Sequence, residues 1–334
     1  MPWIALADTP TPITELPAPP AFPGRLFAKR DDLTSTLFGG NKVRKFEYLL
    51  ADAERHGARA LVTMGGIGSN QALAAALHGR ARHHTVELSL VRQPVTEAVR
   101  RTARGIAASG ARVRYAASFA GGVYNARRAV RARRRAGDRP YYIPLGATNS
   151  LGTLGYVTAA LELARQVAEG ECPPLDCLFV AAGTCGTAAG LIVGGRLAGL
   201  RTRVVAVRVA HPAITTRALL LWHTRRTAAL LARLAPRAPR LRFRWSDITV
   251  VGADAGAGYG RVTAEAERAI EWAGPYLALE PTYTGKAMAA CLDRCGSQAR
   301  DHTVLFWNTH NASDYRTASG FDGLPNRLQR LFRE

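Results

Sequence analysis

The sequence predicts an α/β fold built on parallel β-sheets, and three observations lead to this prediction. Short β-rich runs alternate along the chain with longer amphipathic runs. Most of the short runs are continuously apolar, which is typical of strands covered on both faces. Two of the strands end in a glycine-rich turn that leads directly into a helical run. Ligands in such folds gather at the carboxyl ends of the strands, so these turns are the first places to look for a site.

The elements follow in chain order. Residues 1–25 contain seven prolines and are expected to form an extended arm over the surface. Strands are expected at residues 60–64, 86–91, 111–115, 141–145, 177–182, 204–209, 248–252 and 303–307. Helices are expected at residues 70–82, 96–107, 151–168, 186–198, 263–272 and 285–295, with a further helical stretch beginning near Gly122. Residues 170–174 and 234–244 are expected to be loops.

Length and composition set the broad class of the protein. With 334 residues and 47% hydrophobic content, the chain can bury a large core and is expected to divide into roughly two domains. No apolar run reaches the ~18 residues that span a bilayer, and the N-terminus lacks the features of a signal peptide, so a cytoplasmic protein without a membrane partner is expected. The five cysteines have no metal-ligand spacing, which predicts reduced thiols and no metal site.

The formal charge of +20 raises the possibility of a nucleic-acid partner. Its densest point is the arginine-rich run at residues 127–135, which continues the helical stretch that begins near Gly122. No aromatic residues interleave with these arginines, as a platform for single-stranded nucleic acid would need. We therefore expect a solvated helix face and no nucleic-acid partner, and a basic nucleic-acid-binding protein is the non-enzymatic alternative.

Lysine is rare in this chain, since only four of its 45 basic residues are lysines. Two of the four, Lys42 and Lys45, fall in one short segment after two glycines. A lysine kept where arginine is the rule indicates chemistry that a guanidinium cannot perform, and formation of a Schiff base is such chemistry.

The first glycine-rich turn covers residues 183–190 and follows the strand expected at 177–182. Small residues there let backbone N–H groups converge on an anion at the start of the next helix. The turn lacks the Gly-Lys-Ser/Thr ending of a nucleotide-binding P-loop and the GxGxxG spacing of a dinucleotide-binding fold. A single phosphomonoester is therefore the preferred ligand. A purely structural turn is the alternative.

The second turn covers residues 65–71, where Ser69, Asn70 and Gln71 enter the first turn of a helix and form a suitable receptor for a carboxylate. The alternative is that Ser69 or Asn70 only caps the helix. A phosphate loop, a carboxylate loop and a conspicuous lysine together describe a pyridoxal phosphate site that handles an amino acid.

Three segments carry a resemblance to a known family: residues 39–45 (GGNKVRK), 65–71 (GGIGSNQ) and 283–288 (YTGKAM). The chain resembles the 1-aminocyclopropane-1-carboxylate deaminase and D-cysteine desulfhydrase family from about Lys29 to Thr309. The resemblance implies a fold-type II pyridoxal 5'-phosphate enzyme, like the tryptophan synthase β-chain, with two three-layer parallel-sheet domains and the cofactor between them. A large cofactor-binding domain is expected at residues 1–45 and 155–334, a small one at 46–154, and the assembly is expected to be a homodimer.

The resemblance also implies roles for individual residues. It places the Schiff-base lysine at Lys42, with a pKa lowered by desolvation. Lys45 is expected to be a structural neighbour or to lie just behind the residues that contact the cofactor. Catalytic roles are implied for Lys42, Ser69, Tyr259 and Tyr283. Cofactor contacts are implied for Lys42, Asn70, Gly183, Thr184, Cys185, Gly186, Thr187, Thr284 and Thr309, and contacts to the substrate carboxylate for Ser69, Asn70 and Gln71.

Departures from the family pattern bear on the reaction. Thr284 stands where the deaminases have a glutamate for the pyridine nitrogen, and a hydroxyl cannot hold that nitrogen protonated. Gly68 replaces the usual glutamine and is expected to open space near the substrate, while Gln71 is the deaminase choice. His310 and Asn311 are expected to add bulk beside the ring.

The predicted activity is therefore that of a lyase that acts on a small amino acid. It would eliminate the β-substituent of a D-cysteine-like substrate and release a 2-oxo acid and ammonia. Opening of 1-aminocyclopropane-1-carboxylate and a specialised β-replacement are the enzymatic alternatives. A non-enzymatic protein that only binds the cofactor or an amino acid is another alternative, although it would not need two active-site tyrosines.

Overall fold

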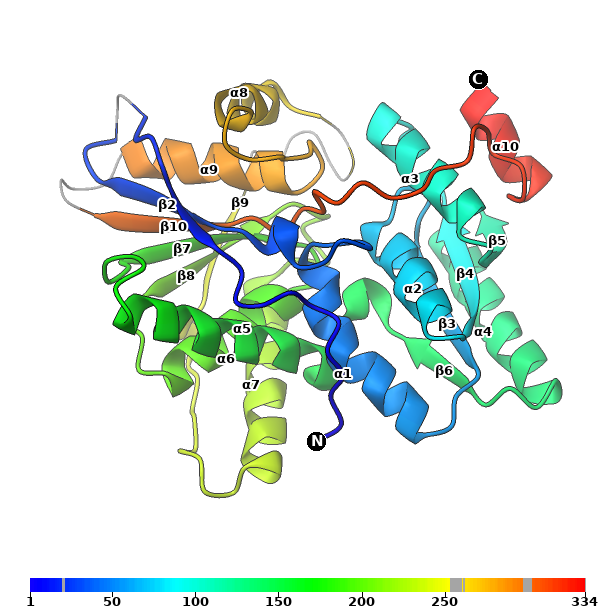
Figure 1. Ribbon diagram of the computed structural model, residues 1–334, viewed down its shortest axis with the longest axis horizontal. Coiled ribbons are helices and arrows are strands. Elements are labelled where there is room, and N and C mark those ends of the chain that lie inside the picture. Colours follow the sequence, from blue (N-terminus) through cyan, green and yellow to red (C-terminus); the bar gives the residue numbers. More distant parts are fainter. Residues whose placement is uncertain (20–21, 253–259, 261, 297–301, 334) are drawn as a thin grey trace.

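The protein contains two β-sheets, each covered by helices on both faces (Figure 1). The computed structural model describes residues 1–19, 22–252, 260, 262–296 and 302–333. The larger sheet has the strand order β1-β2-β10-β7-β8-β9 and the smaller has β5-β4-β3-β6. Neighbouring strands are parallel throughout, except that β1 and β2 are antiparallel.

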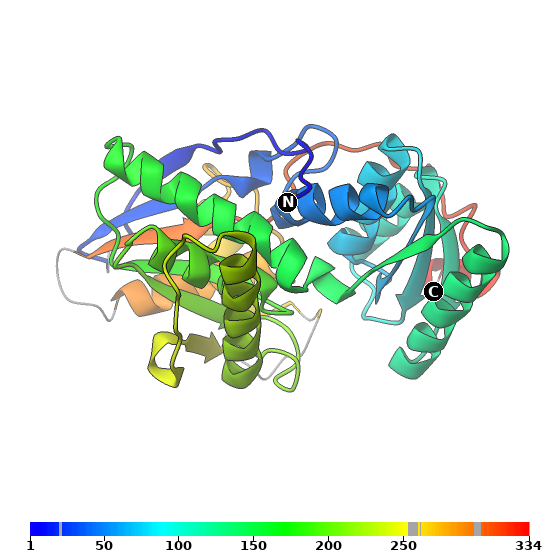
Figure 2. The same ribbon diagram turned by 90° about the horizontal axis from the view of Figure 1, so that it is seen from below.

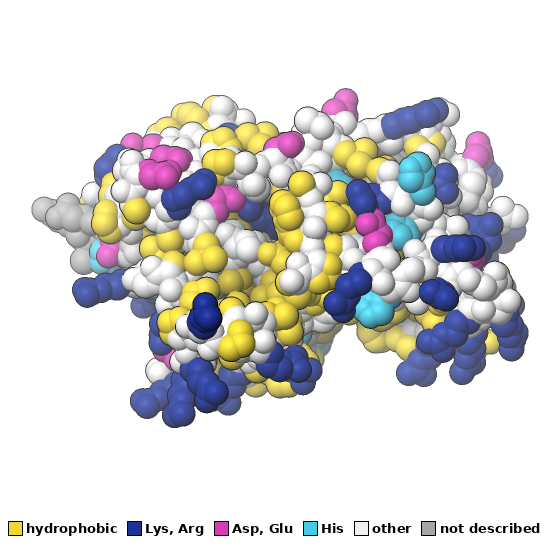
Figure 3. Space-filling view, turned by 60° about the horizontal axis from the view of Figure 1, so that its bottom comes forward, with side chains coloured by type: hydrophobic (Ala, Val, Ile, Leu, Met, Phe, Trp, Pro, Cys, Tyr) yellow, Lys and Arg dark blue, Asp and Glu magenta, His cyan; other side chains and the backbone are white. Residues whose placement is uncertain are grey.

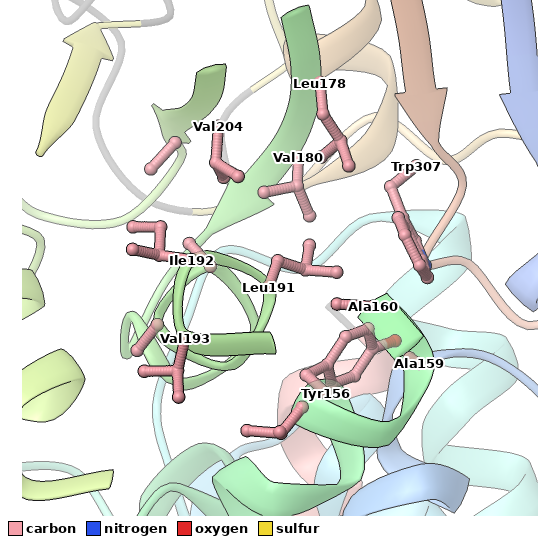
Figure 4. Packing of buried hydrophobic residues seen from close by; sticks show 14 of the residues in the cluster. Tyr156, Ala159, Ala160, Leu178, Val180, Leu191, Ile192, Val193, Val204 and Trp307 are labelled. Carbon is pink, nitrogen blue, oxygen red and sulfur yellow. The ribbon is translucent and has the colours of Figure 1, made fainter. Parts of the chain in front are cut away.

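The strands of the larger sheet are β1 (Ile13–Leu16), β2 (Arg25–Lys29), β7 (Cys177–Ala182), β8 (Arg203–Arg208), β9 (Thr249–Gly252) and β10 (Thr303–Trp307). Helices α8 (Ala264–Ala273) and α9 (Thr284–Gly296) cover one face. Helices α5 (Ser150–Ala168), α6 (Gly186–Leu197) and α7 (Arg217–Leu234) lie on the other, where α5 and α6 pack against each other. Alternate residues of β7 point to the two faces, so Leu178 and Val180 join one core and Cys177 and Phe179 the other (Figure 4).

The strands of the smaller sheet are β3 (Ala60–Gly66), β4 (Thr85–Val91), β5 (Arg112–Ala116) and β6 (Pro140–Ile143). Helix α4 (Phe119–Arg135) packs on one face, and α2 (Asn70–Ala81) with α3 (Glu97–Ala108) lies on the other. Helix α1 (Asn41–Arg55) packs against both α5 and α2 and so joins the two halves, which lie side by side in Figure 2. The predicted α/β class, with parallel three-layer units, is confirmed.

A buried polar network lies beneath the first turns of α1. Both Tyr156 Oη and Trp307 Nε1 donate hydrogen bonds to Asp31 Oδ2, at 2.6 and 2.7 Å. The same carboxylate accepts hydrogen bonds from the guanidinium of Arg44, which also forms an ion pair with Glu162. Glu162 in turn accepts from the buried amine of Lys29. Because the network joins α1, α5, β2 and β10, it holds the helix that carries Lys42 against the larger sheet.

Every predicted strand and helix is present, with boundaries within three residues of those expected. The arginine-rich helix begins at Phe119, where Ser118 caps it, and it buries Ala126 and Ala129 while Arg127 and Arg128 face solvent. Local sequence patterns did not reveal five further elements, which are β1, β2, α1, α7 and α10 (Asn326–Arg333). β1 lies inside the proline-rich arm, where four residues gain a strand conformation only by pairing with β2.

The C-terminal segment packs against the smaller sheet's core, to which Leu324, Leu328 and Phe332 belong. Figure 1 shows α10 beside α3. The side chains of Cys172, Cys177, Cys185 and Cys291 are buried, and the first three are free thiols. Within the described ranges, no helix is both long and apolar enough to cross a membrane.

Candidate active site

The carboxyl ends of strands from both sheets meet at one cavity of about 280 Å³. The ends of β3 and β4 and the residues that follow β6 form one side, and the ends of β7, β8 and β10 form the other. Every predicted site residue lines this cavity apart from Tyr259, which lies outside the described residues. In Figure 3, hydrophobic side chains gather on the surface between the two halves of the molecule.

Lys42 lies in the first turn of α1 and lines the cavity. The turn before it depends on Gly40, whose φ of 80° suits glycine and whose place leaves no room for a side chain. A β-carbon at Gly40 would lie 2.7 Å from His310 O and 2.8 Å from Thr309 O. This close approach brings the lysine to the end of β10. Burial lowers the pKa of Lys42 to about 8, so a large share of the amine is neutral near that pH.

The start of α6 has the features of an anion site. Helices α2, α3, α4, α5, α7 and α8 each begin with a side chain that accepts a hydrogen bond from the first turn. No side chain caps α6, whose preceding residue Cys185 adopts a left-handed conformation with φ 66°. The N–H groups of the first turn of α6 therefore face the cavity without a side-chain acceptor. Burial raises the pKa of the Cys185 thiol to about 12, so this residue adds no competing negative charge.

Lys45 carries the second amine of the site and is 1% exposed. Its Nζ donates to Gly146 O at 3.2 Å and to Thr148 Oγ1 at 3.3 Å, and it has no carboxylate partner within the part of the chain that the structure describes. A β-carbon at Gly186 would come within 3.0 Å of this amine, which places the amine beside the start of α6. Burial, with the nearby charge of Lys42, moves the pKa of Lys45 well below its usual value. Lys45 thus lies closer to the ligand space than expected, since it lines the cavity itself.

The turn before α2 both caps that helix and forms part of the cavity wall. Ser69 Oγ accepts a hydrogen bond from Ala72 N at 3.2 Å, so Ser69 caps the helix as the structural alternative predicted. The same residue lines the cavity, together with Asn70 and Gln71. A hydroxyl that accepts from a backbone N–H keeps its own hydrogen available for donation. Capping and ligand binding are therefore compatible at Ser69.

The expectation that Gly68 opens space near the substrate is wrong. A β-carbon at this position would lie 2.6 Å from Val99 Cγ2 and 3.0 Å from Gln93 Nε2. Gln93 follows β4, lines the cavity and fills the region next to the turn. Because Gln93 and Val99 lie more than twenty residues further along the chain, nothing in residues 65–71 could have indicated them.

Glu280 is a residue of the site that no sequence motif indicated. It lines the cavity, is 9% exposed, and accepts hydrogen bonds from the backbone N–H groups of Thr282, Tyr283 and Thr284 at 2.7 to 2.9 Å. An acidic residue a few positions before a helix is a recognisable start signal, and it could have identified Glu280. Tyr283 and Thr284 are thus held at the cavity wall by a carboxylate.

The two residues after Thr309 differ in position. His310 lines the cavity, and its pKa is lowered by burial, which the charges of Glu280 and Asp32 oppose. Asn311 instead accepts from Gly39 N and donates to Ser313 O. The expectation that both residues crowd the ring is therefore wrong for Asn311, which supports the glycine turn before Lys42.

Comparisons with known proteins agree with this arrangement. The pyridoxal-phosphate dependent enzyme family matches residues 4–310. D-cysteine desulfhydrases of Salmonella paratyphi A and Salmonella choleraesuis are each 33% identical over an alignment of 335 positions, gaps included, that covers 93% of this chain and 94% of theirs. A solved structure described as an ACC deaminase homologue has a TM-score of 0.79 and 28% identity, and the match covers 93% of this chain and 92% of that one. An O-ureido-L-serine synthase, at 19% identity and a TM-score of 0.63, shares the fold, with coverage of 90% and 89%.

Proposed function

The chain belongs to the pyridoxal-phosphate dependent enzymes, and from this premise we propose that it eliminates the β-substituent of a small, D-cysteine-like amino acid. Its cofactor is pyridoxal phosphate and its reaction class is that of a lyase. The proposed products are the released thiol, a 2-oxo acid and ammonia. One observation carries the proposal: the amine of Lys42, whose pKa burial lowers to about 8, shares a cavity with a second buried amine and with a helix N-terminus that no side chain caps.

The residues at the start of α6 fit the phosphate of the cofactor. The uncapped N–H groups after Cys185 supply donors, and the helix dipole favours negative charge at this end. A phosphate beside the Lys45 amine would favour its charged form and so oppose the lowering of its pKa by burial. Asn41 Nδ2 donates to Thr187 Oγ1 at 3.1 Å and so links this loop to the turn that carries Lys42. We propose that residues 183–187 and Lys45 hold the phosphate.

The residues around Lys42 are proposed to perform the proton transfers. The bound cofactor supplies an electron sink for the pair left when the α-proton departs. Lys42 Nζ, once released from the cofactor, takes this proton from the substrate Cα, because its lowered pKa keeps a neutral amine available. The Cβ–S bond then breaks with its electron pair moving to sulfur, which takes up a proton, while the pair from Cα forms the Cα–Cβ double bond. The released enamine tautomerises to an imine, which adds water and loses ammonia to give the 2-oxo acid.

The substrate carboxylate is proposed to bind at the start of α2. The backbone N–H groups of Asn70 and Gln71 lie in the first helical turn, where the helix itself provides no acceptor. The hydroxyl of Ser69 adds a donor, and Asn70 is proposed to contact the cofactor. Tyr283 is proposed to act on the leaving group from beside Gly183, since its Cε1 lies 4.0 Å from the place of a β-carbon there. A catalytic role is also proposed for Tyr259, which lies outside the described residues.

A second candidate is opening of 1-aminocyclopropane-1-carboxylate, and the position of Glu280 favours it. Its carboxylate is 3.4 Å from Thr284 Oγ1, so the hydroxyl proposed to face the pyridine nitrogen is backed by a negative charge. That charge would help to hold the nitrogen protonated.

We also propose the division into a larger domain at residues 1–45 and 155–334 and a smaller one at 46–154. Strands of the larger sheet fall in the first set and strands of the smaller in the second, which supports it. Leu328 and Phe332 pack in the core of the smaller sheet. In this division the C-terminal segment therefore belongs to the larger domain by sequence but packs against the smaller one. A homodimer is proposed as well, and sedimentation at several protein concentrations tests it.

The test of the reaction uses the purified protein loaded with pyridoxal phosphate. D-cysteine, L-cysteine, β-chloro-D-alanine and 1-aminocyclopropane-1-carboxylate are each added, and 2-oxo acid, ammonia and sulfide are measured. Release of all three products from D-cysteine, lost in Lys42→Ala, is the expected result. Reaction of the cyclopropane substrate alone would favour the second candidate. A colourless protein that gains no absorbance band with added cofactor would overturn both.

A further inference from the structure

Two large apolar side chains that line the cavity are exposed to solvent at its rim. Phe119 is 58% exposed and Ile214 is 39% exposed. Phe119 is the first residue of α4, which covers the smaller sheet, and Ile214 lies in the loop that follows β8 of the larger sheet. Single exposed apolar residues are ordinary on protein surfaces. Two at the rim of one cavity, contributed by different halves of the molecule, indicate a surface that a ligand covers.

The start of α4 holds Phe119 at the cavity. Ser118 Oγ accepts a backbone hydrogen bond from the first turn at 3.1 Å, so Phe119 follows a capped helix start. A β-carbon at Gly122 would lie 2.4 Å from Val91 Cγ1 and 3.1 Å from Met64 Sδ. Gly122 therefore lets the first turn lie directly on the ends of β3 and β4. This close packing brings Phe119 to the rim.

Ile214 is held from the other half by the phosphate loop. Its backbone N–H donates to His211 O at 2.8 Å, which closes a turn after β8. The next residue, Thr215, is fully buried, and its hydroxyl donates to Gly183 O at 2.6 Å. Because Gly183 is the first residue of the glycine-rich loop, the turn and the loop keep a fixed spacing. Ile214 is thus a built part of the rim.

The rim also carries the exposed side chains of Arg92 and His211. Polar head groups such as these stay hydrated when the cavity is empty. The exposed surfaces of Phe119 and Ile214 instead leave water only when an apolar group covers them, and that transfer is favourable. The rim therefore favours an apolar substituent over an acidic one.

We propose that Phe119 and Ile214 bind an alkyl group carried on the sulfur of the substrate, so that S-alkyl cysteines are substrates of this site. The inference rests on the proposed function for the reaction and adds the substrate class. The bond that breaks is still Cβ–S, whose electron pair and a proton complete an alkyl thiol. The remaining skeleton gives the same 2-oxo acid and ammonia after water is added. Each methylene buried at the rim contributes about fourfold to affinity.

Binding is measured with amino acids that lack a β-leaving group and so cannot undergo the elimination. The protein loaded with pyridoxal phosphate is titrated with 2-aminobutyrate, which has the length of cysteine, and with norleucine, which has the length of S-ethylcysteine. Both hands of each are used, and the absorbance of the cofactor reports the Kd. Norleucine of the preferred hand is expected to bind at least roughly tenfold more tightly, the effect of two buried methylenes. S-ethylcysteine of that hand is expected to release ethanethiol and the 2-oxo acid.

Four variants assign the effect to the rim. Phe119→Ser and Ile214→Ser are each expected to reduce the ratio of the two Kd values, and the double variant is expected to bring it towards one. Tyr124 on α4 is 62% exposed and Leu161 on α5 is 39% exposed, and neither is among the described residues that line the cavity. Tyr124→Ser and Leu161→Ser are therefore the matched controls and are expected to keep the wild-type ratio.

An equal Kd for norleucine and 2-aminobutyrate in the wild type, or an unchanged ratio in the double variant, overturns the inference. Tighter binding of 2-aminoadipate, which ends in a carboxylate, than of norleucine overturns it as well, and so does release of 2-oxo acid from cysteine but not from S-ethylcysteine. Failure of the proposed function looks different. Neither cysteine nor S-ethylcysteine of either hand would then release a 2-oxo acid, while the ratio of Kd values persists and still falls in the double variant.

Discussion

The hydroxyl of Thr284 lies 3.4 Å from Oε1 of Glu280, and the backbone N–H of Glu280 donates to that hydroxyl at 2.9 Å. The two residues stand four positions apart across the turn that begins α9. The carboxylate also accepts from three consecutive backbone N–H groups, so it fixes the hydroxyl in the cavity wall. The uncharged side chain of Thr284 in the cavity wall therefore lies directly against the negative charge of Glu280.

This relationship leads to a prediction for Glu280→Gln. Glutamine keeps the size of the side chain and one acceptor oxygen, so the turn should survive with little change in the midpoint of thermal unfolding. Loss of the charge should lower kcat for 2-oxo acid release by roughly tenfold or more, because a nearby preorganised charge contributes on that scale. Steady-state kinetics beside a melting curve checks it. A variant that melts early but turns over normally would show that Glu280 is only a cap.

The lowered pKa of Lys42 predicts a pH dependence of cofactor loading. Only the neutral amine attacks the aldehyde of pyridoxal phosphate, and burial brings the pKa from 10.5 to about 8. The neutral fraction rises as the pH rises through about 8 and is nearly complete above it. The loading rate of cofactor-free protein should therefore climb between pH 7 and 8 and level off by about pH 9. A rate that keeps rising towards pH 10.5 would contradict the lowered pKa.

Lys45→Met should weaken binding of the cofactor through its phosphate. Truncating one member of a buried charge pair costs about 2 kcal/mol or more, so the Kd for pyridoxal phosphate should rise at least roughly thirtyfold. Pyridoxal, which lacks the phosphate, is the matched control ligand, and its affinity should change little. Calorimetric titration of both ligands checks this, and an equal loss for the two would place the effect of Lys45 elsewhere.

Arg44→Met should destabilise the fold strongly, because it leaves the buried carboxylates of Asp31 and Glu162 without their main partner. Removing one member of a buried ionic network costs about 3–5 kcal/mol. Denaturant unfolding of the cofactor-free protein measures the loss. The exposed pair of Arg25 and Glu15 is the matched control, and Arg25→Met should leave the unfolding midpoint almost unchanged.

The same network predicts how stability falls in acid. Burial alone would raise the pKa of Glu162, but hydrogen bonds and charges from Arg44 and Lys29 lower it from 4.5 to about 2. Because the folded-state pKa is below the unfolded one, this stabilisation is complete above pH 4.5 and is lost as the pH falls towards 2. Glu162→Gln should flatten the decline in the free energy of unfolding over this window. An equally steep decline in the variant would assign the acid sensitivity to other carboxylates.

Much of the fold followed from local patterns, because apolar runs mark strands covered on both faces and glycine-rich turns mark their carboxyl ends. The strand that supports the phosphate loop was predicted at residues 177–182 and occupies Cys177–Ala182. The elements that local patterns did not reveal depend on distant partners. β1 is a strand because its backbone pairs with β2, and Glu280 is a site residue because the turn before α9 lies at the cavity.

The sequence by itself determined the family, the cofactor and the set of segments that surround the cavity, because lysine, glycine and serine at those spacings have direct chemical meanings. Only the tertiary structure decided which atoms remain available there. It placed Gln93 over Gly66 and Gly68, committed the Gln71 nitrogen to Thr63, and left Lys45 buried beside an uncapped helix. Hydrogen-bond commitments and burial depend on residues far apart in the chain, which come together only when the two sheets and their helices pack.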